Sequence, residues 1–577
     1  MHSLSKLAIT GGMLGLWLQS AGAQAQCTEV PSTETYDYIV VGSGAGGIPM
    51  ADRLSEAGHK VLLIEKGPPS TGRWGGTMKP TWLNETSLTR FDVPGLCNQI
   101  WADPTGCICT DVDQMAGCML GGGTAVNAGL WWKPHPADWD VNFPEGWRSK
   151  DVAAATDRVF SRIPGTITPS MDGKRYLEQG FAMLDRNLKA AGWEYLVPNE
   201  HPDRKNRTYG QATFMYSGGE RGGPLATYLV TASGRKTFTL WMHTMAKRVV
   251  REGGHATGVE VECSGASGHA GVVPLTQGTG RVILSAGAFG SAKLLFRSGI
   301  GPTSQLNVVK NSTDGPTMIS SDQWINLPVG YNLNDHVGTD IEIAHPDVVF
   351  YDYYGAWTKP IVSDTEMYLA NRTGPFAQAA PNIGPIMWEI IKGSDGISRH
   401  IQWQARVEGS LNTSMTITQY LGTGTVSRGR MTITRQLNTI VSTPPYLRDA
   451  HDREAVIQGI ENLRLTLKDV ANLTWISPKP NVTTEAFVDS IPAIPARRCS
   501  NHWIGTAKMG ADDGRSGGTA VVDLDTKVYG TDNIFVVDAS IFPGHITGNP
   551  SAMIVIAAEH AVTRILALPV PKAAASV

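Results

Sequence analysis

The sequence lacks an excess of basic residues. Its 49 Lys and Arg are outnumbered by 52 Asp and Glu, which gives a formal net charge of −3. A nucleic-acid-binding protein needs a basic surface to displace counterions from phosphates, so this balance argues against a general nucleic-acid binder. Charged residues are only 18% of the 577 residues and hydrophobic residues 41%, a composition typical of globular proteins rather than disordered ones. The sequence also has no internal repeats, low-complexity tracts or blocks of like charge.

Long apolar runs are absent too. The most apolar stretch, residues 7–18, is too short to span about 30 Å of hydrocarbon, so we expect no membrane partner. This stretch follows the positive charge of Lys6 and precedes small-x-small cleavage sites within residues 21–25. The pattern predicts a secretory signal peptide, residues 1–25, and hence a secreted, extracellular protein.

Cysteine is scarce, and its spacing excludes common metal motifs. Cys107 and Cys109 are one residue apart, which is not a CxxC pair, and no His cluster accompanies them, so we predict no metal site. An odd number leaves at least one cysteine unpaired in a monomer, and a local disulfide is plausible within residues 97–118. Seven Asn-x-Ser/Thr sites fit a glycosylated secreted protein. The seven cysteines are Cys27, Cys97, Cys107, Cys109, Cys118, Cys263 and Cys499, and the glycosylation sites are Asn84, Asn206, Asn311, Asn371, Asn412, Asn472 and Asn481.

Glycine, by contrast, is abundant, and three glycines near the N-terminus form a GxGxxG motif. The motif follows the β-branched and aromatic run Tyr38–Val41, which predicts a buried strand. A helical pattern over residues 48–58 and a second apolar strand over residues 60–65 complete a β-α-β unit. In such a unit the first glycine makes the turn, the second admits a pyrophosphate, and the third lets helix and strand pack closely. The glycines are Gly42, Gly44 and Gly47.

Glu65 ends the second strand of this unit, where a carboxylate accepts hydrogen bonds from ribose hydroxyls. The unit alone does not separate NAD from FAD. Asp538, at the end of a late strand, is a candidate for contact with the pyrophosphate or ribityl chain of FAD, but an Asp at this position is equally common as a helix N-cap.

Buried, parallel-type strands recur at residues 281–287 and 534–538, each followed by a helical pattern, at 290–297 and 552–568. Between them, residues 238–261 alternate like a strand meander, residues 414–420 and 430–435 alternate like antiparallel strands, and residues 174–191 show a helical pattern. We therefore predict an α/β fold, α+β overall, with a discontinuous Rossmann-like domain and a substrate domain built on an antiparallel sheet. The nucleotide-binding domain is assigned residues 35–150, 225–315 and 515–570, and the substrate domain residues 151–224 and 316–514.

Four segments in order resemble the glucose–methanol–choline (GMC) oxidoreductases. Residues 117–130 and 287–301 are similar to the two signatures of that family, although Ala292 replaces the usual Pro or Ser. Residues 327–336 and 533–540 resemble further landmarks. The resemblance runs from about Tyr36 to Leu568 and implies the GMC fold with FAD as cofactor.

Within that family the sequence most resembles the flavin domain of ascomycete cellobiose dehydrogenases. Local segments support this likeness: residues 172–176, 218–221, 427–430 and 500–503. The sequence departs from those enzymes because only about ten residues separate the predicted signal peptide from the flavin domain. We therefore expect no cytochrome domain and no electron transfer through a tethered haem.

The resemblance implies roles for individual residues. His502 takes the place of the catalytic base, because an imidazole with a pKa near neutrality suits removal of a hydroxyl proton. Asn549 takes the place of the partner that orients the substrate. The expected FAD contacts are Gly42, Gly44, Gly47, Glu65, Gly122, Gly123, Thr124, Asn127, Ala128, Gly129, Leu130, Val249, Asp538, Ala539, Asn549 and Pro550. The expected sugar contacts are Glu220, Arg428, Ser500, Asn501 and His502.

Other polar and aromatic residues carry weaker expectations. His545 is expected at the wall or rim of the site, and His336 is expected to stabilise a turn with Asp335. Trp131, Trp132 and Trp503 could stack on sugar rings or belong to the core, and the sequence favours neither.

The implied reaction is oxidation of the anomeric C1 hydroxyl of cellobiose, cello-oligosaccharides or lactose to the lactone, with hydride transfer to N5 of FAD. Electrons would then pass to a quinone or another acceptor, with a copper-dependent lytic polysaccharide monooxygenase as a candidate partner. Two alternatives remain open: a GMC glucose, oligosaccharide or aryl-alcohol oxidase or dehydrogenase, and a non-redox GMC-fold lyase or cyclase. A catalytically silent carbohydrate-binding relic is disfavoured by the presence of His502 and Asn549.

Overall fold

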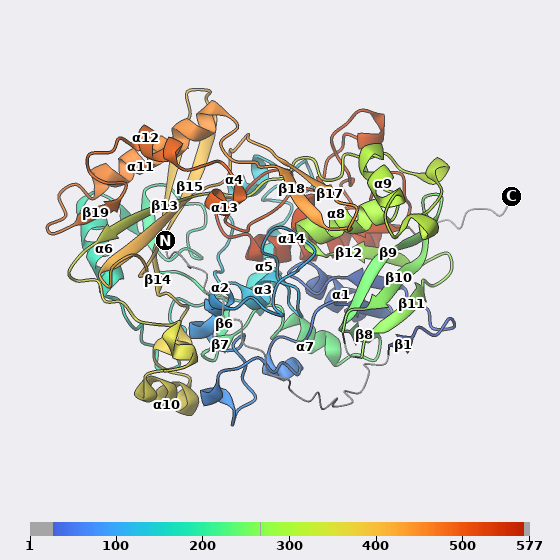
Figure 1. Cartoon of the computed structure of the whole chain (residues 1–577), viewed down its shortest axis with the longest axis horizontal. Coiled ribbons are helices and arrows are strands. Elements are labelled where there is room, and N and C mark those ends of the chain that lie inside the picture. The colour runs from blue at the N-terminus through green and yellow to red at the C-terminus, as the bar shows by residue number, and fades with distance from the viewer. Residues whose placement is uncertain (1–26, 266, 570–577) are drawn as a thin grey trace, which may run out of the picture.

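The computed structural model describes residues 27–265 and 267–569, which form two sheet-based lobes (Figure 1). The predicted signal peptide, residues 1–25, lies outside the described residues. Among the helices of the described ranges, none is long and apolar enough to cross a membrane.

A five-stranded parallel sheet forms the core of one lobe, on the right in Figure 1. Four of its strands, all but β8, are buried at every residue, which explains why they read as continuous apolar runs. The edge strand β8 was expected in the meander, but it pairs with β3 instead. In spatial order the strands are β20 (Ile534–Val536), β12 (Arg281–Leu284), β2 (Tyr38–Val41), β3 (Val61–Ile64) and β8 (Phe238–Trp241).

Helices and a smaller sheet enclose this parallel sheet. Helix α1 (Gly47–Glu56) packs on β2 and β3 and contacts α7 (Tyr228–Ser233) and α14 (Ser551–Ala567). Helix α8 (Gly287–Arg297) contacts the meander. The meander and its edge strand form a four-stranded sheet of β1 (Thr28–Glu29), β11 (His269–Pro274), β10 (His255–Cys263) and β9 (Thr244–Glu252).

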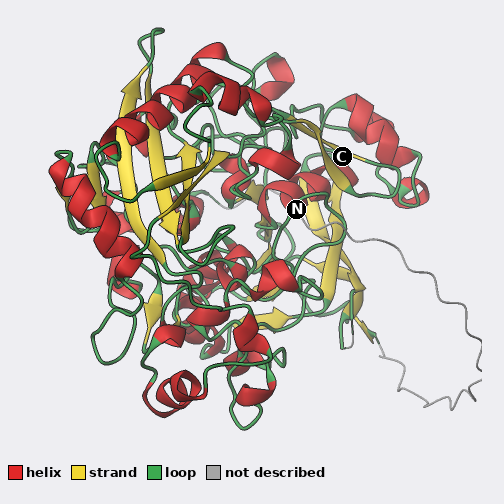
Figure 2. Cartoon of the chain, turned by 60° about the vertical axis from the view of Figure 1, so that its left-hand side comes forward, coloured by secondary structure: helices red, strands yellow, loops and turns green. Residues whose placement is uncertain are grey.

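A seven-stranded, mostly antiparallel sheet forms the second lobe (Figure 2). Side chains alternate along its long strands: Ile341, Ile417 and Trp403 are buried on the face that carries α11 (Ala450–Thr466), while polar side chains occupy the opposite face. In spatial order the strands are β19 (Thr474–Ser477), β13 (Val337–Ala344), β16 (Ser414–Leu421), β15 (Ser398–Arg406), β14 (Ile383–Lys392), β5 (Thr208–Gly210) and β4 (Glu194–Tyr195).

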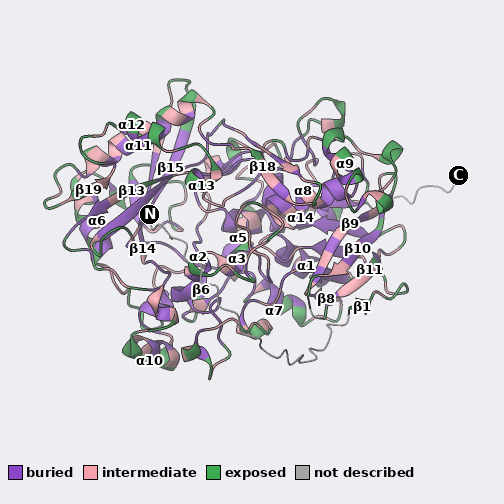
Figure 3. Ribbon diagram, viewed as in Figure 1, coloured by how far each residue is buried: buried purple, intermediate pink, exposed green. Residues whose placement is uncertain are grey.

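Short elements connect the two lobes. The strands of the five-stranded sheet and the long strands of the seven-stranded sheet are mainly buried (Figure 3). The pattern over residues 174–191 becomes helical only from Gln179. The remaining helices are α2 (Gln99–Ala102), α3 (Gly123–Val126), α4 (Pro136–Asp140), α5 (Ala153–Arg162), α6 (Gln179–Ala190), α9 (Thr303–Lys310), α10 (Val362–Asn371), α12 (Thr484–Ser490) and α13 (Pro495–Arg498); the remaining strands are β6 (Tyr216–Ser217), β7 (Glu220–Arg221), β17 (Arg430–Ile433) and β18 (Thr439–Thr443).

Helix α5 departs from the predicted division of the chain. It falls within the range 151–224 that the sequence assigned to the substrate domain, yet it contacts α14. Arg158 of α5 forms an ion pair with the fully buried Glu559 of α14, and Arg162 pairs with the buried Asp52 of α1. These pairs attach α5 to the lobe that carries the parallel sheet.

Two disulfides join segments of the first lobe. Cys27 pairs with Cys263, which links the first described residue to the end of β10. Cys109 pairs with Cys118, a local bridge within the stretch where one was expected.

Candidate active site

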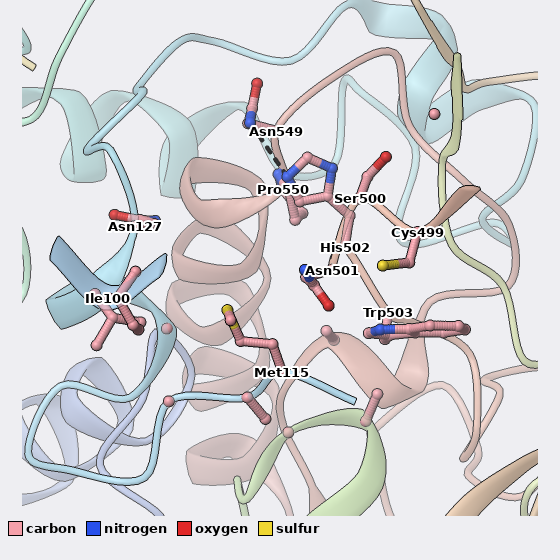
Figure 4. Close-up of a pocket in the computed structure, with 18 of the residues that line it drawn as sticks. Ile100, Met115, Asn127, Cys499, Ser500, Asn501, His502, Trp503, Asn549 and Pro550 are labelled. Atoms are coloured by element: carbon pink, nitrogen blue, oxygen red, sulfur yellow. Dashed lines mark hydrogen bonds between the residues drawn. The ribbon is translucent and has the colours of Figure 1, made fainter. Parts of the chain in front are cut away.

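A cavity of about 1520 Å³ lies between the carboxyl ends of the parallel strands and the polar face of the seven-stranded sheet. Its floor is formed by Gly42–Gly46 after β2, and its far wall includes Gly338, Asp340 and Glu342 of β13. Figure 4 shows the region between them, where His502 and Asn549 face each other. Ligands of α/β sheets bind at this carboxyl edge of the strands.

Bare glycine backbone forms the floor of the cavity. A Cβ atom added to Gly46 would lie 2.1 Å from the carbonyl oxygen of Val537, and one added to Gly47 would lie 1.8 Å from that of Gly42. Only glycine therefore lets the start of α1 approach β2 and β20 so closely. Gly44 differs, because a Cβ there would meet no atom within 4 Å. It faces open space in the cavity, as the second glycine of a pyrophosphate-binding turn must.

Glu65 and Asp538 line this end of the cavity from β3 and from the turn after β20. The Glu65 carboxylate accepts hydrogen bonds from the main-chain N–H of Ser43 at 3.1 Å and from that of Gly67 at 2.8 Å. Asp538 accepts from the main-chain N–H groups of Gly287 and Ser540, each at 2.8 Å. Both acids thus fix the loops at the strand ends, and Asp538 caps the turn that follows it. Burial raises the pKa of Asp538.

The segment around α3 forms a side wall of the cavity. The Asn127 side-chain amide donates to Ser551 Oγ at the start of α14, at 3.0 Å. The buried guanidinium of Arg221 donates to the carbonyl oxygens of Thr124 and Asn127. These bonds hold the segment against the first turn of α14. The predicted cofactor contacts that line the cavity are Gly42, Gly44, Glu65, Gly122, Gly123, Thr124, Asn127, Ala128, Leu130, Asp538, Ala539, Asn549 and Pro550.

Three predicted cofactor contacts lie elsewhere. Gly47 packs against the Gly42 carbonyl rather than lining the cavity, and a Cβ at Gly129 would collide with the Tyr216 ring at 2.4 Å. Val249 is buried in β9, where its main-chain N–H donates to Ser298 Oγ at 2.9 Å. The lining residues of β9 are instead at the start of the strand: Thr244, Met245 and Ala246.

The Ser500–His502 segment forms a tight turn at the other end of the cavity. Asn501 adopts a left-handed conformation with φ of 56°, which Asn tolerates better than most residues. The turn lets one buried carboxyl group, that of Asp335, accept from the main-chain N–H of Ser500 at 2.8 Å and of His502 at 2.7 Å. Burial raises the pKa of Asp335 to about 7. Asn501 Oδ1 has no hydrogen-bond partner among the described residues and lies in the cavity lining.

His502 and Asn549 meet above this turn (Figure 4). His502 Nε2 lies 3.2 Å from Asn549 Nδ2, and His502 Nδ1 lies 3.1 Å from His336 Nδ1. Burial lowers the pKa of His502 to about 4, so its imidazole is neutral at ordinary pH and able to accept a proton. The pair therefore has the geometry for removal of a hydroxyl proton next to an amide that holds the oxygen.

The structure corrects the expectations for the two neighbouring histidines. The His336 side chain does not stabilise a turn with Asp335 but contacts His502 with one ring nitrogen and the Ile546 carbonyl oxygen, at 2.7 Å, with the other. His545 is buried behind His336, with ring centroids 3.5 Å apart, and is not part of the cavity wall. Burial lowers the pKa of both side chains well below the usual value.

Two predicted sugar contacts are also placed away from the cavity. Glu220 forms an ion pair with Arg372 at 2.6 Å. Arg428 donates to Asn332 Oδ1 at 2.9 Å and to two main-chain carbonyls of its own loop, so its guanidinium serves the fold. Ser500, Asn501 and His502 do line the cavity. Of the three tryptophans, Trp131 and Trp132 belong to the core, whereas Trp503 lines the cavity with an indole N–H that has no partner among the described residues.

The polar face of the seven-stranded sheet was not predicted from the sequence. The ladder registers place Asp340, Thr418 and Gln404 side by side in one row. One neighbouring row, beside His502, consists of Gly338, Tyr420 and Gln402. The other, which lies farthest from His502, consists of Glu342, Thr416 and Arg406. We call these nine residues the polar grid; eight of them line the cavity, and Gln402 contacts Asn549. Alternation over residues 414–420 was visible in the sequence, but not which side of the strand faces the cavity.

The residues present fit FAD. The glycine-rich turn Gly42–Gly46 precedes α1, whose N-terminus has no side-chain cap among the described residues and so leaves N–H groups for a pyrophosphate. Glu65, which follows β3 and lines the cavity, is the carboxylate that would accept hydrogen bonds from a ribose. At the far end, the unpartnered polar atoms Asn501 Oδ1 and Trp503 Nε1 indicate a polar group between the floor and His502.

Comparisons with known proteins agree with this interpretation. Residues 36–338 and 425–558 match the two GMC oxidoreductase family models. An oxygen-dependent choline dehydrogenase from Rhizobium rhizogenes is 26% identical over 576 residues, covering 92% of this chain and 96% of its own. The mitochondrial choline dehydrogenase of Homo sapiens is 25% identical, covering 96% and 93%. The fold is that of Aspergillus oryzae formate oxidase, with a TM-score of 0.73, 18% identity and coverage of 93% and 99%.

These relatives are not cellobiose dehydrogenases, so the finer likeness rests on the sequence segments alone. The family match covers both halves of the cavity: the glycine floor lies in the first matched range, and His502 with Asn549 lies in the second. The chain belongs to the GMC oxidoreductase family and is an FAD-dependent oxidoreductase.

Proposed function

We propose that this protein is a dehydrogenase that oxidises the anomeric C1 hydroxyl of cellobiose and related β-1,4-linked oligosaccharides to the lactone. The observation that carries this proposal is the polar grid opposite His502. A sugar presents hydroxyl groups on every edge, and binding it requires a wall of hydrogen-bonding partners, because each polar group buried without one costs free energy.

The size of the grid favours more than one sugar ring. Side chains on one face of a strand are about 6.6 Å apart, so the farthest of the three rows lies about 13 Å from the first, the Tyr420 row. The Tyr420 ring lies 5.6 Å from the His502 ring, so a sugar whose C1 reaches His502 would bind with its reacting carbon at that end of the grid. The farthest row presents the guanidinium of Arg406, which is within 3.6 Å of the Asp340 carboxylate and 3.1 Å of Glu408. This fork is suited to the hydroxyls of a second ring.

The proton chemistry belongs to the chain's own residues. His502 Nε2 accepts the proton of the C1 hydroxyl, and the Asn549 amide donates to the same oxygen and holds it in place. When bound, FAD supplies the acceptor for the hydride that leaves C1, so that two electrons and two protons leave the sugar in total.

We also propose that the protein is secreted and glycosylated. All seven Asn-x-Ser/Thr asparagines are exposed, as attachment of a glycan requires. The two disulfides fit an oxidising compartment. A secreted dehydrogenase needs an extracellular electron acceptor, and a quinone or a copper-dependent lytic polysaccharide monooxygenase is the partner we propose.

Steady-state assays with a quinone acceptor test the proposal. We expect kcat/KM for cellobiose to exceed that for glucose, choline and an aromatic alcohol at least tenfold, with little hydrogen peroxide formed in air. Equal or higher kcat/KM for choline or the aromatic alcohol would refute the carbohydrate assignment, and peroxide formed in step with substrate oxidation would make the enzyme an oxidase.

A further inference from the structure

A continuous series of hydrogen bonds runs through the active site. On one side, the indole Nε1 of Trp388 lies 3.2 Å from Gln402 Oε1, and Gln402 Nε2 lies 2.9 Å from Asn549 Oδ1. Trp388 is fully buried in β14 and Gln402 is fully buried in β15. The loop that carries Asn549 can approach Gln402 only because it begins with Gly548, where a Cβ would lie 2.0 Å from Gln402 Oε1.

On the other side, the series continues through two histidines. Asn549 Nδ2 lies 3.2 Å from His502 Nε2, and the Nδ1 atoms of His502 and His336 lie 3.1 Å apart. His336 Nε2 lies 2.7 Å from the carbonyl oxygen of Ile546, where the series ends.

The two ends fix the direction of every bond between them. An indole N–H can only donate, and a carbonyl oxygen can only accept. Gln402 must therefore accept with Oε1 and donate with Nε2, so Asn549 accepts with Oδ1 and turns its N–H group toward His502. From the other end, His336 donates with Nε2 and is left with a lone pair on Nδ1, so His502 must carry its proton on Nδ1. Both arguments leave the lone pair of His502 on Nε2.

We propose that Gln402 and His336 are positioning residues that together fix the amide orientation of Asn549 and the tautomer of His502, so that the unprotonated, basic nitrogen of His502 is Nε2, the one beside Asn549. This inference rests on the proposed role of His502 as the base. It assigns the two residues no contact with the substrate: they act through Asn549 and His502. Burial keeps His336 neutral, which preserves its acceptor nitrogen.

Replacing Gln402 with Glu tests the direction of the series with almost no change of shape. An ionised carboxylate has only acceptors, so it accepts from Trp388 and also from Asn549. Asn549 then turns its oxygen toward His502, which must place its proton on Nε2 and can no longer act as a base. We expect kcat to fall about 100-fold at pH values above the pKa of the new carboxyl group, which burial raises, with KM changed less than threefold, because general-base catalysis contributes about 10²- to 10⁴-fold.

The pH profile separates this effect from simple damage. Once protonated, the new carboxyl group can accept from Trp388 and donate to Asn549, as the Gln402 amide does. The kcat of Gln402→Glu should therefore recover as the pH falls through the pKa of that carboxyl group. The titratable groups around Gln402 are His502, beyond Asn549, and Tyr420, opposite Gln402 across the ladder. They also include His400, two residues earlier in β15, and Lys205, whose Nζ lies 5.5 Å from the Trp388 ring centroid.

Gln305→Glu is the matched control for this variant. Gln305 is buried outside the cavity, and its Oε1 accepts from the Ile433 N–H, a bond that a carboxylate retains. The pH profile of this control should equal that of the wild type.

A neutron structure of the wild-type holoenzyme provides a readout that needs no turnover. We expect deuterium on Nδ1 and not on Nε2 of His502, and the Asn549 nitrogen toward His502. Deuterium on Nε2, or a Gln402→Glu variant with wild-type kcat and pH profile, would overturn the proposal. If instead His502 is not the base, a His502→Ala variant will keep its full activity, whatever the neutron map shows.

Discussion

Asp335 holds His502, the proposed catalytic base, by its main chain. The buried carboxyl group accepts the N–H of His502 at 2.7 Å and that of Ser500 at 2.8 Å, and it also accepts the phenolic hydroxyl of Tyr446 at 2.9 Å. One side chain thereby closes the turn whose left-handed residue is Asn501, and its neighbour His336 contacts the His502 ring. Main-chain and side-chain placement of His502 thus come from two consecutive residues.

Asp335→Asn should loosen this turn. The new NH2 group must face a main-chain N–H or the Tyr446 hydroxyl, so at least one buried donor loses its acceptor, at a cost of about 1–3 kcal/mol. We expect the free energy of unfolding to fall by that amount and kcat to fall at least tenfold. Asp469→Asn, at a side chain that is 89% exposed, is the control. Denaturation curves and kinetics indistinguishable between the two variants would contradict this role of Asp335.

His502→Ala removes the proposed base without touching the cofactor floor. We expect kcat to fall about 10²- to 10⁴-fold while the visible absorbance of bound FAD stays at the wild-type level. His201→Ala, at an exposed histidine, should keep full activity. A His502→Ala enzyme with near-normal kcat at its pH optimum would show that another group takes the proton.

The pH dependence of kcat/KM follows from the lowered pKa of His502. Because burial moves that pKa down to about 4, the basic form is present above this pH and is lost as the pH falls through it. We expect kcat/KM to decline about tenfold per pH unit below about pH 4 and His502 to impose no decline between about pH 5 and 6. If the acid limb of the kcat/KM profile instead has its midpoint at about 6.5, the usual pKa of His, the imidazole is better solvated than its burial implies.

Gly44→Ala should separate cofactor binding from folding. A Cβ at this position meets no protein atom within 4 Å, but it projects into the space where a pyrophosphate would approach. We expect the apoprotein to unfold like a Gly234→Ala control, whose added Cβ meets only the Thr231 carbonyl oxygen at 3.6 Å. The dissociation constant for FAD, measured by fluorescence titration of the apoprotein, should rise at least tenfold. Wild-type FAD affinity would move the pyrophosphate away from Gly44.

Arg406→Ala tests the far row of the polar grid. Loss of a charged hydrogen-bond donor costs about 1.5–3 kcal/mol of binding, so KM for cellobiose should rise about 10- to 100-fold while kcat changes little. Arg186→Ala, at a side chain that is 62% exposed, should leave both constants unchanged. If KM for cellobiose stays the same in Arg406→Ala, the second ring does not bind at this row.

The sequence predicted the nucleotide-binding lobe well because its information is local. Strand β2 has the predicted bounds, and Gly42, Gly44 and Glu65 line the cavity where the β-α-β pattern placed them. Buried parallel strands read as apolar runs and glycine turns have a fixed spacing, so neighbouring residues suffice. Strand β8 was misassigned because an edge strand is only half buried and reads like the meander that follows it.

The substrate wall could not be predicted in the same way, because it depends on pairing between distant strands. Arg406 faces the cavity only because β15 lies beside β16 in one register, and a shift of one residue would bury it. Arg428 has the same side chain but lies in a loop that uses it for main-chain contacts. A local sequence pattern contains neither the register nor those contacts, and for the same reason it did not reveal that Gln402 contacts Asn549.

Anaerobic mixing of the purified holoenzyme with cellobiose, and separately with glucose and with choline, tests the central claim most directly. The visible absorbance of FAD is lost when it accepts a hydride, so the rate of bleaching measures the oxidation of each substrate without any electron acceptor. We predict rapid bleaching by cellobiose, slower bleaching by glucose and none by choline. Rapid bleaching by choline, or no bleaching by either sugar, would contradict the assignment of a carbohydrate dehydrogenase.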